Sequence, residues 1–399
     1  MLPSTRPDER DGDRGPDIAP AQAPTRGDGL RVVALLDTVQ LSGPGRQLAA
    51  LARCLSSRGV DLRVVTFHRT GRARAPYLDH LDGANVRYLV LPESGPLDAR
   101  LIARLRRVLA DWAPSIVQTH GYKPSALACL LRLAGAEWRW IAFSHGTTTE
   151  NPKTRFYHWL DARLMARADR VVAMSRRHQA ALSHLGGRAR VVYNAVLPAA
   201  PEDARAAPGL PADLVDMPRP VLGVVGRLSP EKGVDVFLHA CGELARRAVE
   251  FSAVVAGDGP QRKELETLRD ALGLYDRVRF VGTLARVESL YSCLDLLVIP
   301  SRSEGLPNVL LEALRANIAV VATRVGAVPE VIDSPGAGTL VLPEAPVALA
   351  DAIERSLAGE NDAEATAARR MVAERFSLER RVLAHLELYA DVLRPCDGD

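Results

Sequence analysis

The chain has 399 residues, more than a single hydrophobic core usually supports, so at least two domains are expected. Hydrophobic residues make up 47% of the sequence and charged residues 25%, as in ordinary soluble globular proteins. A net charge of +3 is too small to indicate nucleic-acid binding. The five cysteines are far apart and form no Cys-x-x-Cys pair, which argues against a disulfide framework or a zinc site and fits the reducing cytoplasm.

Residues 1–28 are rich in Pro, Asp, Arg and Gly and contain no apolar run. They lack the apolar stretch of a signal peptide, and we expect a disordered N-terminal extension. No segment reaches the roughly 18 uncharged apolar residues of a membrane span. We therefore expect a cytoplasmic protein.

Residues 29–197 alternate short, β-branched apolar runs with amphipathic helical patterns. The predicted strands are Arg31–Asp37, Leu62–Phe67, Val86–Leu91, Ser115–His120, Arg139–His145, Arg170–Met174 and Arg190–Tyr193. The predicted helices are Gln47–Ser57, Leu97–Trp112, Pro124–Ala134, Thr154–Ala168 and Arg176–Leu185. Apolar strands that alternate with helices indicate a parallel sheet covered on both faces.

Residues 198–219 are rich in Pro and Ala without periodicity and are predicted to be an interdomain linker. The alternation restarts over residues 220–375. Its predicted strands are Val221–Gly226, Ser252–Ala256, Val278–Val281, Leu294–Ile299, Ile318–Thr323 and Thr339–Leu342. Its predicted helices are Val234–Arg247, Gln261–Leu272, Arg286–Ser292, Asn308–Ala316, Ala345–Leu357 and Ala363–Arg375, and a last helix, Leu378–Leu393, lies in residues 376–399. The fold class is therefore α/β, with two doubly wound Rossmann-like domains and a default ligand site in the cleft between them.

The first chemically unusual loop of the second unit is Gly226-Arg227-Leu228-Ser229-Pro230-Glu231-Lys232-Gly233. Arg227 directly follows a strand, and Lys232 precedes a helix. Cations at a helix start oppose the macrodipole unless an anion binds there, and a diphosphate suits both side chains. A solvated basic loop is the alternative interpretation.

A second loop, Gly257-Asp258-Gly259-Pro260, also follows a buried strand and opens a helix. Gly257 and Gly259 permit a ligand to approach the backbone closely. The same tetrapeptide is also ordinary turn chemistry.

The third loop, Glu304-Gly305-Leu306-Pro307-Asn308-Val309-Leu310-Leu311-Glu312, is the most specific. Pro307 is suited to a first helical turn, and the N–H groups around Gly305 and Leu306 form an anion site. Glu312 lies one turn into the helix in an apolar run, where a carboxylate needs a partner. Ribose hydroxyls are suitable partners. The alternative is that Glu312 is exposed or salt-bridged within its own domain.

Cations, helix N-termini and two carboxylates at one sheet edge predict a nucleotide-diphosphate-sugar site. This half of the chain resembles family 4 of the retaining GT-B glycosyltransferases, whose Glu-x7-Glu signature matches Glu304 and Glu312. The resemblance implies that Arg227 and Lys232 bind the diphosphate, that Glu304 holds the donor sugar hydroxyls and that Glu312 binds the ribose. Base contacts are expected around Gly282-Thr283-Leu284, where Thr283 and Leu284 are counted as donor-binding residues.

The first half resembles the same family in Leu41-Ser42-Gly43-Pro44-Gly45-Arg46, where Ser42 replaces the first of two usual glycines. The resemblance places Gly43 near the diphosphate and Arg46 on the acceptor side. His120 and His145 end two strands; the resemblance implies that His145 approaches the donor sugar and that His120 lies near the acceptor. For Asn194, we expect a role in a turn. The resemblance also implies that the last helix, in residues 376–399, crosses back to pack on the N-terminal domain.

The resemblance implies sugar transfer with retention of anomeric configuration, with Glu304, His145, Arg227 and Lys232 as the catalytic group and domain closure excluding water. No cofactor or metal is expected, because the two cations can replace a metal. The expected partners are a nucleotide-sugar donor and a glycan, lipid-linked or small-molecule acceptor, with bacterial polysaccharide or glycoconjugate synthesis as the expected context by analogy. A nucleotide-sugar epimerase of related fold and a non-catalytic nucleotide-sugar-binding protein are the alternatives. An oxidoreductase is disfavoured, since no strand is followed by Gly-x-Gly-x-x-Gly.

Peripheral contact with the inner membrane surface is a further hypothesis. Four arginines, at positions 100, 104, 106 and 107, share a predicted helix with Leu101, Ile102, Leu105, Val108 and Trp112. Basic amphipathic helices can lie on anionic lipid. The alternative is a helix with one face in the core and the other in solvent.

Overall fold

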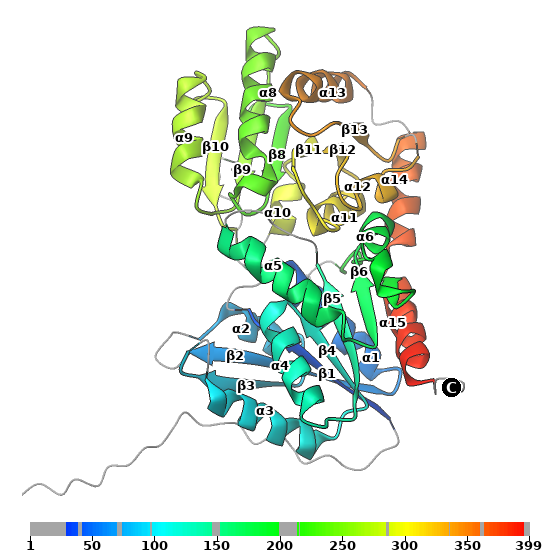
Figure 1. The fold of residues 1–399 in the computed structure, drawn as a ribbon. Helices are drawn as coiled ribbons and strands as arrows, with labels where there is room; N and C mark the ends of the chain where they lie inside the picture. Colours follow the sequence, from blue (N-terminus) through cyan, green and yellow to red (C-terminus); the bar gives the residue numbers. More distant parts are fainter. Residues whose placement is uncertain are drawn as a thin grey trace, which may run out of the picture.

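The computed structural model describes residues 29–38, 42–69, 74–95, 98–145, 152–198, 214, 216–284, 287–334, 336–359 and 363–394. The predicted disordered extension 1–28 and residues 199–213 and 215 of the predicted linker 198–219 lie outside these residues. The described chain forms two α/β domains stacked one above the other (Figure 1).

The N-terminal domain is built on a seven-stranded parallel sheet with the order β3-β2-β1-β4-β5-β6-β7. Its strands are β1 (Leu30–Leu36), β2 (Val60–Arg69), β3 (Tyr88–Glu93), β4 (Ile116–His120), β5 (Arg139–Ser144), β6 (Arg170–Ala173) and β7 (Ala189–Val191). Its helices are α1 (Gly43–Ser56), α2 (Pro76–Gly83), α3 (Ala99–Trp112), α4 (Tyr122–Leu133), α5 (Pro152–Met165) and α6 (Arg176–Ala181), with the 3-10 helix η1 (Ser183–Leu185).

The C-terminal domain has a six-stranded parallel sheet with the order β10-β9-β8-β11-β12-β13. Its strands are β8 (Val221–Val225), β9 (Ser252–Ala256), β10 (Val278–Gly282), β11 (Leu296–Ile299), β12 (Ala319–Thr323) and β13 (Thr339–Val341). Its helices are η3 (Pro230–Lys232), α8 (Val234–Arg246), α9 (Arg262–Ala271), α10 (Val287–Tyr291), α11 (Asn308–Arg315), α12 (Val328–Val331), α13 (Pro346–Ala358) and α14 (Ala363–Arg375). Buried residues from both faces of these strands enter hydrophobic clusters, so the strands are apolar almost throughout.

The predicted α/β class with two doubly wound sheets is confirmed, and the strands agree with prediction apart from shifts of a few residues at their ends. Two short helices, α2 and α12, were not predicted, since 8 and 4 residues carry too little periodicity to detect. The predicted helix Arg176–Leu185 is interrupted at Leu182, and its second part is the 3-10 helix η1.

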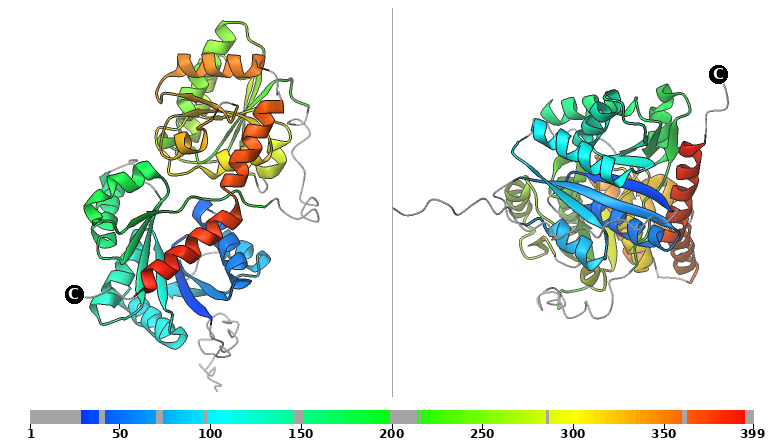
Figure 2. Two further views of the ribbon diagram at one scale, coloured as in Figure 1. Left: turned by 90° about the vertical axis from the view of Figure 1, so that its right-hand side faces the viewer. Right: turned by 90° about the horizontal axis from the view of Figure 1, so that it is seen from below.

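The last helix, α15 (Leu378–Leu393), crosses from the C-terminal domain to pack along the N-terminal sheet (Figure 2). Its Asp391 Oδ2 accepts a hydrogen bond from Arg170 Nε at 2.7 Å, and its Tyr389 hydroxyl donates to Gln118 Oε1 at 2.9 Å. The crossing follows an isolated parallel bridge between Val196 and Ser377. The chain therefore passes between the domains twice, and these two crossings lie side by side.

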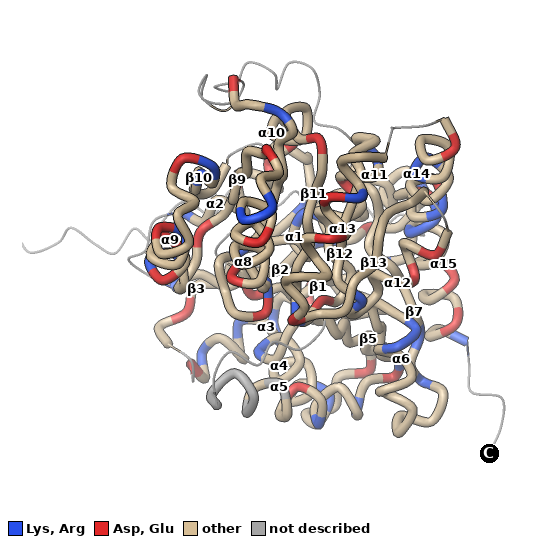
Figure 3. The backbone as a smooth tube through the Cα atoms, turned by 90° about the horizontal axis from the view of Figure 1, so that it is seen from above, with Lys and Arg blue, Asp and Glu red and all other residues tan. Residues whose placement is uncertain are grey.

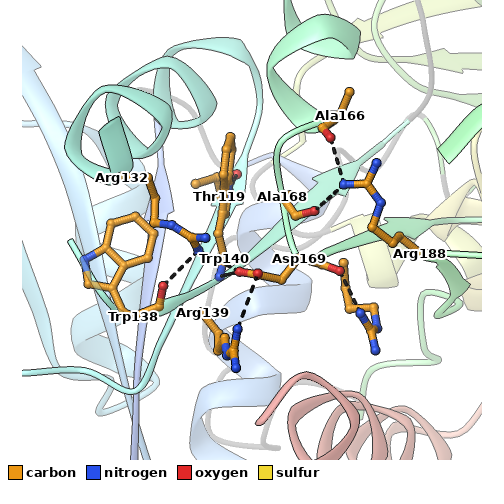
Figure 4. Close-up of polar contacts among 10 residues, drawn as sticks. Thr119, Arg132, Trp138, Arg139, Trp140, Ala166, Ala168, Asp169 and Arg188 are labelled. Atoms are coloured by element: carbon orange, nitrogen blue, oxygen red, sulfur yellow. Dashed lines mark hydrogen bonds and ion pairs between the residues drawn. The ribbon is translucent and has the colours of Figure 1, made fainter. Parts of the chain in front are cut away.

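A half-buried carboxylate positions the central strands of the N-terminal sheet (Figure 4). Asp169 Oδ2 accepts from Arg132 Nη1 at 2.7 Å and from the backbone N–H of Trp140 at 2.6 Å. The Trp140 indole donates to Thr119 Oγ1 at 3.0 Å. These contacts fix β4 and β5 relative to each other, and the carboxyl ends of these two strands lead to His120 and His145.

Candidate active site

The loops expected to bind the donor lie at the topological switch point of the C-terminal sheet. The strand order runs in opposite directions from β8 and β11, so the connections that follow them diverge and leave a crevice. Lys232 follows β8 and Glu304 follows β11. In the N-terminal sheet the corresponding neighbours are β1 and β4, which lead to the Gly43 loop and to His120.

Lys232 and Glu304 are in direct contact. Lys232 Nζ lies 2.7 Å from Glu304 Oε1, and the Glu304 side chain is only 8% exposed. Ser301 Oγ also donates to Glu304 Oε1 at 2.7 Å. A buried carboxylate needs such partners, so this pair is the charged centre of the site.

The backbone around this pair is held closely. Gly233, with φ 63°, separates η3 from α8, and a Cβ there would lie 2.2 Å from the Pro300 carbonyl oxygen. A Cβ at Gly326 would lie 2.0 Å from the Glu304 carbonyl oxygen. Arg302 donates two hydrogen bonds to Asp235, both 2.7 Å long. The loops after β8, β11 and β12 are therefore packed directly against one another. Arg227, at the start of the first of these loops, has an exposed side chain.

The glycines of the second loop serve loop packing. A Cβ on Gly257 would lie 1.8 Å from the Gly226 carbonyl oxygen, and a Cβ on Gly259 would lie 2.3 Å from that of Leu228. The sequence interpretation assigned these glycines to close approach of a ligand. In the structure their smallness lets this loop contact the Arg227 loop.

The third loop contacts the N-terminal domain. A Cβ on Gly305 would lie 2.7 Å from the His145 carbonyl oxygen, and the buried Leu306 accepts a hydrogen bond through its carbonyl from Asn194 Nδ2 at 3.0 Å. Pro307 is the extended N-cap of α11, one residue before the first turn in which it was predicted. Within the described residues, the N–H groups of Gly305 and Leu306 donate to no backbone carbonyl, which suits the predicted anion site.

Glu312 is buried and bridges the cleft. It accepts a hydrogen bond from the Tyr291 hydroxyl at 2.7 Å, and Arg46 Nη1 lies 3.3 Å from its carboxylate. Burial and the Glu312 charge raise the pKa of Tyr291. Neither alternative for Glu312, exposure or an ion pair within its own domain, describes this arrangement.

Arg46 reaches across the domain boundary. Its guanidinium contacts two carboxylates of the C-terminal domain, Glu312 and Glu288, the latter at 2.8 Å. Its place on the acceptor side stays a prediction. Sequence reasoning missed Glu288, because no local pattern distinguishes it from a solvated helix residue.

Gly43 lies against the C-terminal domain, since a Cβ there would meet Asn308 Nδ2 at 2.7 Å. Gln47 Nε2 of the same helix donates to Asn308 Oδ1 at 3.1 Å. Ser42, in extended conformation, is the N-cap of α1 and accepts from the Gly45 N–H at 3.2 Å. The unusual serine is thus compatible with the loop and contributes a helix cap.

The two histidines, which were predicted to end strands on the cleft side, are hydrogen-bonded to each other. His120 Nδ1 and His145 Nε2 lie 2.9 Å apart, and their rings stack. Burial, followed by the charge of Arg381, lowers the pKa of His145 to about 4. Burial also lowers the pKa of His120, with His145 and Arg381 contributing. Both imidazoles are therefore neutral near pH 7.

Asn194 joins three parts of the molecule, whereas a role in a turn was expected. Besides its bond to Leu306, its Oδ1 accepts from Arg381 Nη1 of α15 at 2.9 Å. A second bridge runs from Glu330, which accepts from the Tyr193 hydroxyl at 2.5 Å and from the Arg176 N–H at 3.0 Å. Sequence reasoning singled out neither Arg381 nor Glu330.

Thr283 and Leu284, predicted near the base, follow β10 at the same sheet edge. Thr283 is exposed and Leu284 is half-buried. The Gly257 N–H donates to the Gly282 carbonyl at 2.7 Å, so this turn is joined to the second loop.

Within the part of the chain that the structure describes, no group of three or more His, Cys, Asp or Glu side chains is arranged to hold a metal ion. Nor does any helix in the described ranges have the length and apolarity to cross a bilayer. The apolar face of α3 is covered, because Leu101, Leu105 and Leu109 are buried in the domain core. In the view of Figure 3, basic and acidic segments are interspersed along α8, α9, α14 and α15.

Comparison with known proteins agrees with this geometry. Residues 42–196 match the family described as glycosyl transferase 4-like domain, and residues 219–359 match glycosyl transferases group 1. The chain is 28% identical to a D-inositol 3-phosphate glycosyltransferase of Saccharomonospora viridis, over 86% of this chain and 88% of that protein. It is 40% identical to the alpha-D-kanosaminyltransferase of Streptomyces kanamyceticus, over 35% of this chain and only 36% of that protein.

The crystal structure of Anabaena Alr3699/HepE in complex with UDP-glucose has the same fold, with a TM-score of 0.73 at 22% identity over 91% of this chain and all of that one. The fold and the site define a two-domain glycosyltransferase. The chain belongs to the group 1, or family 4, glycosyltransferases of the GT-B fold, which confirms the predicted resemblance.

Proposed function

We propose that this glycosyltransferase moves a sugar from a nucleoside-diphosphate donor to an acceptor hydroxyl with retention of anomeric configuration. The contact between Lys232 and Glu304, 2.7 Å long, carries the proposal. A cation and a carboxylate side by side at the switch point match a phosphate joined to a sugar, because the phosphate needs the cation and the sugar hydroxyls need the carboxylate.

The leaving group is stabilised electrostatically in this proposal. Negative charge develops on the diphosphate as the bond between sugar and phosphate breaks. Arg227, Lys232 and the N–H groups near Gly305 stabilise this charge by donating hydrogen bonds to it. When the donor binds, the Glu312 carboxylate releases Arg46 and accepts hydrogen bonds from the ribose hydroxyls. Thr283 and Leu284 contact the base.

We infer that the reaction needs no metal, because Arg227 and Lys232 supply two cations in the loop proposed to bind the diphosphate. Chelation of the purified enzyme with EDTA should leave turnover unchanged. Loss of activity on chelation, with recovery on adding Mg²⁺ or Mn²⁺, would contradict this part of the proposal.

Donor binding is the first test. Wild-type protein is titrated by calorimetry with UDP, GDP and ADP sugars, alongside Arg227→Ala and Glu304→Ala. The matched control is Arg246→Ala, an exposed arginine that pairs within α8, at the end opposite the cleft. One donor should bind wild type and control equally. Arg227→Ala should lose binding, and Glu304→Ala should lose mainly the preference for the sugar over the bare diphosphate.

Failure of every donor to bind, or equal binding by all variants, would overturn the site assignment. Binding without turnover on any acceptor favours the non-catalytic alternative. Incubation of the donor without an acceptor, followed by NMR, tests the epimerase alternative. An epimerase would rearrange the donor sugar or release it alone, whereas a glycosyltransferase needs an acceptor. With an acceptor, the coupling constant of the anomeric proton in the product shows whether configuration is retained.

The acceptor is a glycan, a lipid-linked glycan or a small polyol in bacterial polysaccharide or glycoconjugate synthesis. The relatives' names direct the first panel: D-inositol 3-phosphate and an aminocyclitol, with lipopolysaccharide core acceptors added. Transfer to none of them would move the search to other lipid-linked acceptors.

Peripheral membrane contact, if made through α3, is electrostatic, since the apolar face of that helix is buried in the core. Its exposed arginines, including Arg100, Arg106 and Arg107, face outward. Cosedimentation with anionic vesicles but not with neutral vesicles, lost when these arginines become Gln, would support it. Equal sedimentation of the variant would exclude α3 as the contact.

A further inference from the structure

A series of buried hydrogen bonds joins the C-terminal helix to the cleft. The Tyr389 hydroxyl donates to Gln118 Oε1 at 2.9 Å. Gln118 Nε2 lies 3.4 Å from His120 Nε2, and His120 Nδ1 lies 2.9 Å from His145 Nε2. Gln118, His120 and Tyr389 are at most 5% exposed. The series therefore runs through the domain interior from α15 to the end of β5.

The chemistry of each group sets the direction of the series. The Gln118 amide nitrogen can only donate, so His120 Nε2 accepts. A neutral imidazole has one N–H, so His120 has its hydrogen on Nδ1 and donates to His145. His145 Nε2 accepts, and its own hydrogen is on Nδ1. This is the ring nitrogen that the series leaves for other contacts.

Donation of the hydrogen bonds in the opposite direction, from His145 toward Tyr389, is unfavourable. It requires the Gln118 amide to turn and donate to the Tyr389 oxygen. Among the described residues, Gln118 is the only hydrogen-bond partner of the Tyr389 hydroxyl. The hydroxyl hydrogen would then be buried without an acceptor, which costs free energy.

The series also needs neutral histidines, and the surroundings supply that condition. Arg381 is 5% exposed and donates through Nη1 to the carbonyl of Tyr193 at 2.7 Å and to Asn194. Within the described chain, the guanidinium donates to these two neutral oxygens and to no carboxylate. Burial is the main cause that lowers the pKa of both histidines. For His120 the charges of His145, Arg381 and His385 add to it, and for His145 those of Arg381 and His178. A second proton on His120 would remove the acceptor that Gln118 needs.

We propose that Gln118 and Tyr389 are positioning residues that hold His145 in the Nδ1–H tautomer, so that it presents a hydrogen-bond donor at the cleft. His145 lies at the domain boundary, with its carbonyl beside Gly305 of the donor loop. A neutral N–H donor suits a sugar hydroxyl oxygen. The identity of that ligand rests on the proposed function, whereas the tautomer itself does not.

The tautomer is measured on the free protein by long-range ¹H–¹⁵N NMR of labelled histidine. Wild type should show His145 protonated at Nδ1 and bare at Nε2. Tyr389→Phe removes the first donor, and Gln118→Met removes the amide at similar length. Both should shift His145 toward the Nε2–H form and lower kcat about tenfold, the effect expected for one hydrogen bond, with little change in donor KM.

Tyr77→Phe is the matched control. Tyr77 is a fully buried tyrosine of the same domain, and within the described residues its hydroxyl has no hydrogen-bond partner. It should leave tautomer and kcat unchanged. The double variant Tyr389→Phe/Gln118→Met should resemble either single variant, because groups that act in series are not additive.

A wild-type His145 protonated at Nε2, or a wild-type tautomer in both variants, would overturn the proposal. The NMR result needs no substrate. A failure of the donor assignment therefore leaves it standing, and a wrong tautomer leaves the donor assignment standing.

Discussion

Arg46 of the N-terminal domain lies 3.3 Å from Glu312 of the C-terminal domain. The carboxylate proposed for the ribose is therefore already paired in the ligand-free protein, by a side chain from across the cleft. A buried carboxylate without a partner is costly, so Arg46 stabilises the site before the donor arrives. Donor binding and domain contact are coupled through this pair.

Glu312 should confer preference for an intact ribose. Glu312→Ala should bind a nucleoside diphosphate about 10- to 100-fold more weakly, because hydrogen bonds to a charged group contribute about 1.5–3 kcal/mol. A 2′,3′-dideoxy nucleotide should bind wild type and variant alike, as measured by calorimetry. If Glu312→Ala still prefers the ribonucleotide, another residue binds the sugar hydroxyls.

Gly257→Ala should abolish donor binding without a change in any charged residue. The new methyl group would lie 1.8 Å from the Gly226 carbonyl oxygen at a φ of +137°, so the loop that carries Arg227 must move. Gly242→Ala, in the middle of α8, meets only side-chain carbons at 3.5 Å or more. It should be neutral or stabilising by about 0.5–1 kcal/mol. Calorimetry and thermal melts compare the two, and equal donor affinity would show that the loop contact is dispensable.

Acidification should destabilise the fold through its buried histidines. Burial, followed by the charge of Arg381, lowers the pKa of His385 to about 3, and the pKa of His145 is about 4. Below their ordinary pKa near 6.5 the unfolded chain binds protons that the folded chain does not, so stability is present above that pH and is lost as pH falls.

Each such histidine adds a slope of at most about 1.4 kcal/mol per pH unit. Denaturant titrations of His385→Phe between pH 6.5 and 4.5 should show a shallower slope than wild type. The control is His184→Gln, because His184 is exposed. This variant should keep the wild-type dependence of stability on pH. An unaltered slope in His385→Phe would mean that this imidazole is already protonated in the folded state.

Asn194 should be important for stability. Asn194→Ala leaves the Leu306 carbonyl and the Arg381 guanidinium each without one partner, and buried unsatisfied groups cost about 1–3 kcal/mol each. We expect a loss of about 2–6 kcal/mol in the free energy of unfolding, measured with denaturant. Asn194→Asp keeps an acceptor for Arg381 and should lose less. A larger loss for Asp than for Ala would contradict this expectation and would show that repulsion between the new carboxylate and the Leu306 carbonyl outweighs the kept contact with Arg381.

The sequence alone determined the two sheets and their order along the chain, because period and apolarity are local properties. It also determined the positions of Arg227, Lys232, Glu304 and Glu312, because each lies next to a predicted strand end or helix start. The sequence did not predict a helix as short as α12, since four residues are too few to show helical periodicity.

Only the tertiary structure decided how these groups are partnered. Arg46 meets Glu288 and Glu312, and Arg381 meets Asn194, across more than 180 residues of sequence. The glycines at 257 and 259 are needed because of carbonyls in a loop about 30 residues earlier. Such contacts depend on how two sheets and a crossing helix are placed in space. No local pattern encodes that placement, because it follows from burying all the apolar faces together.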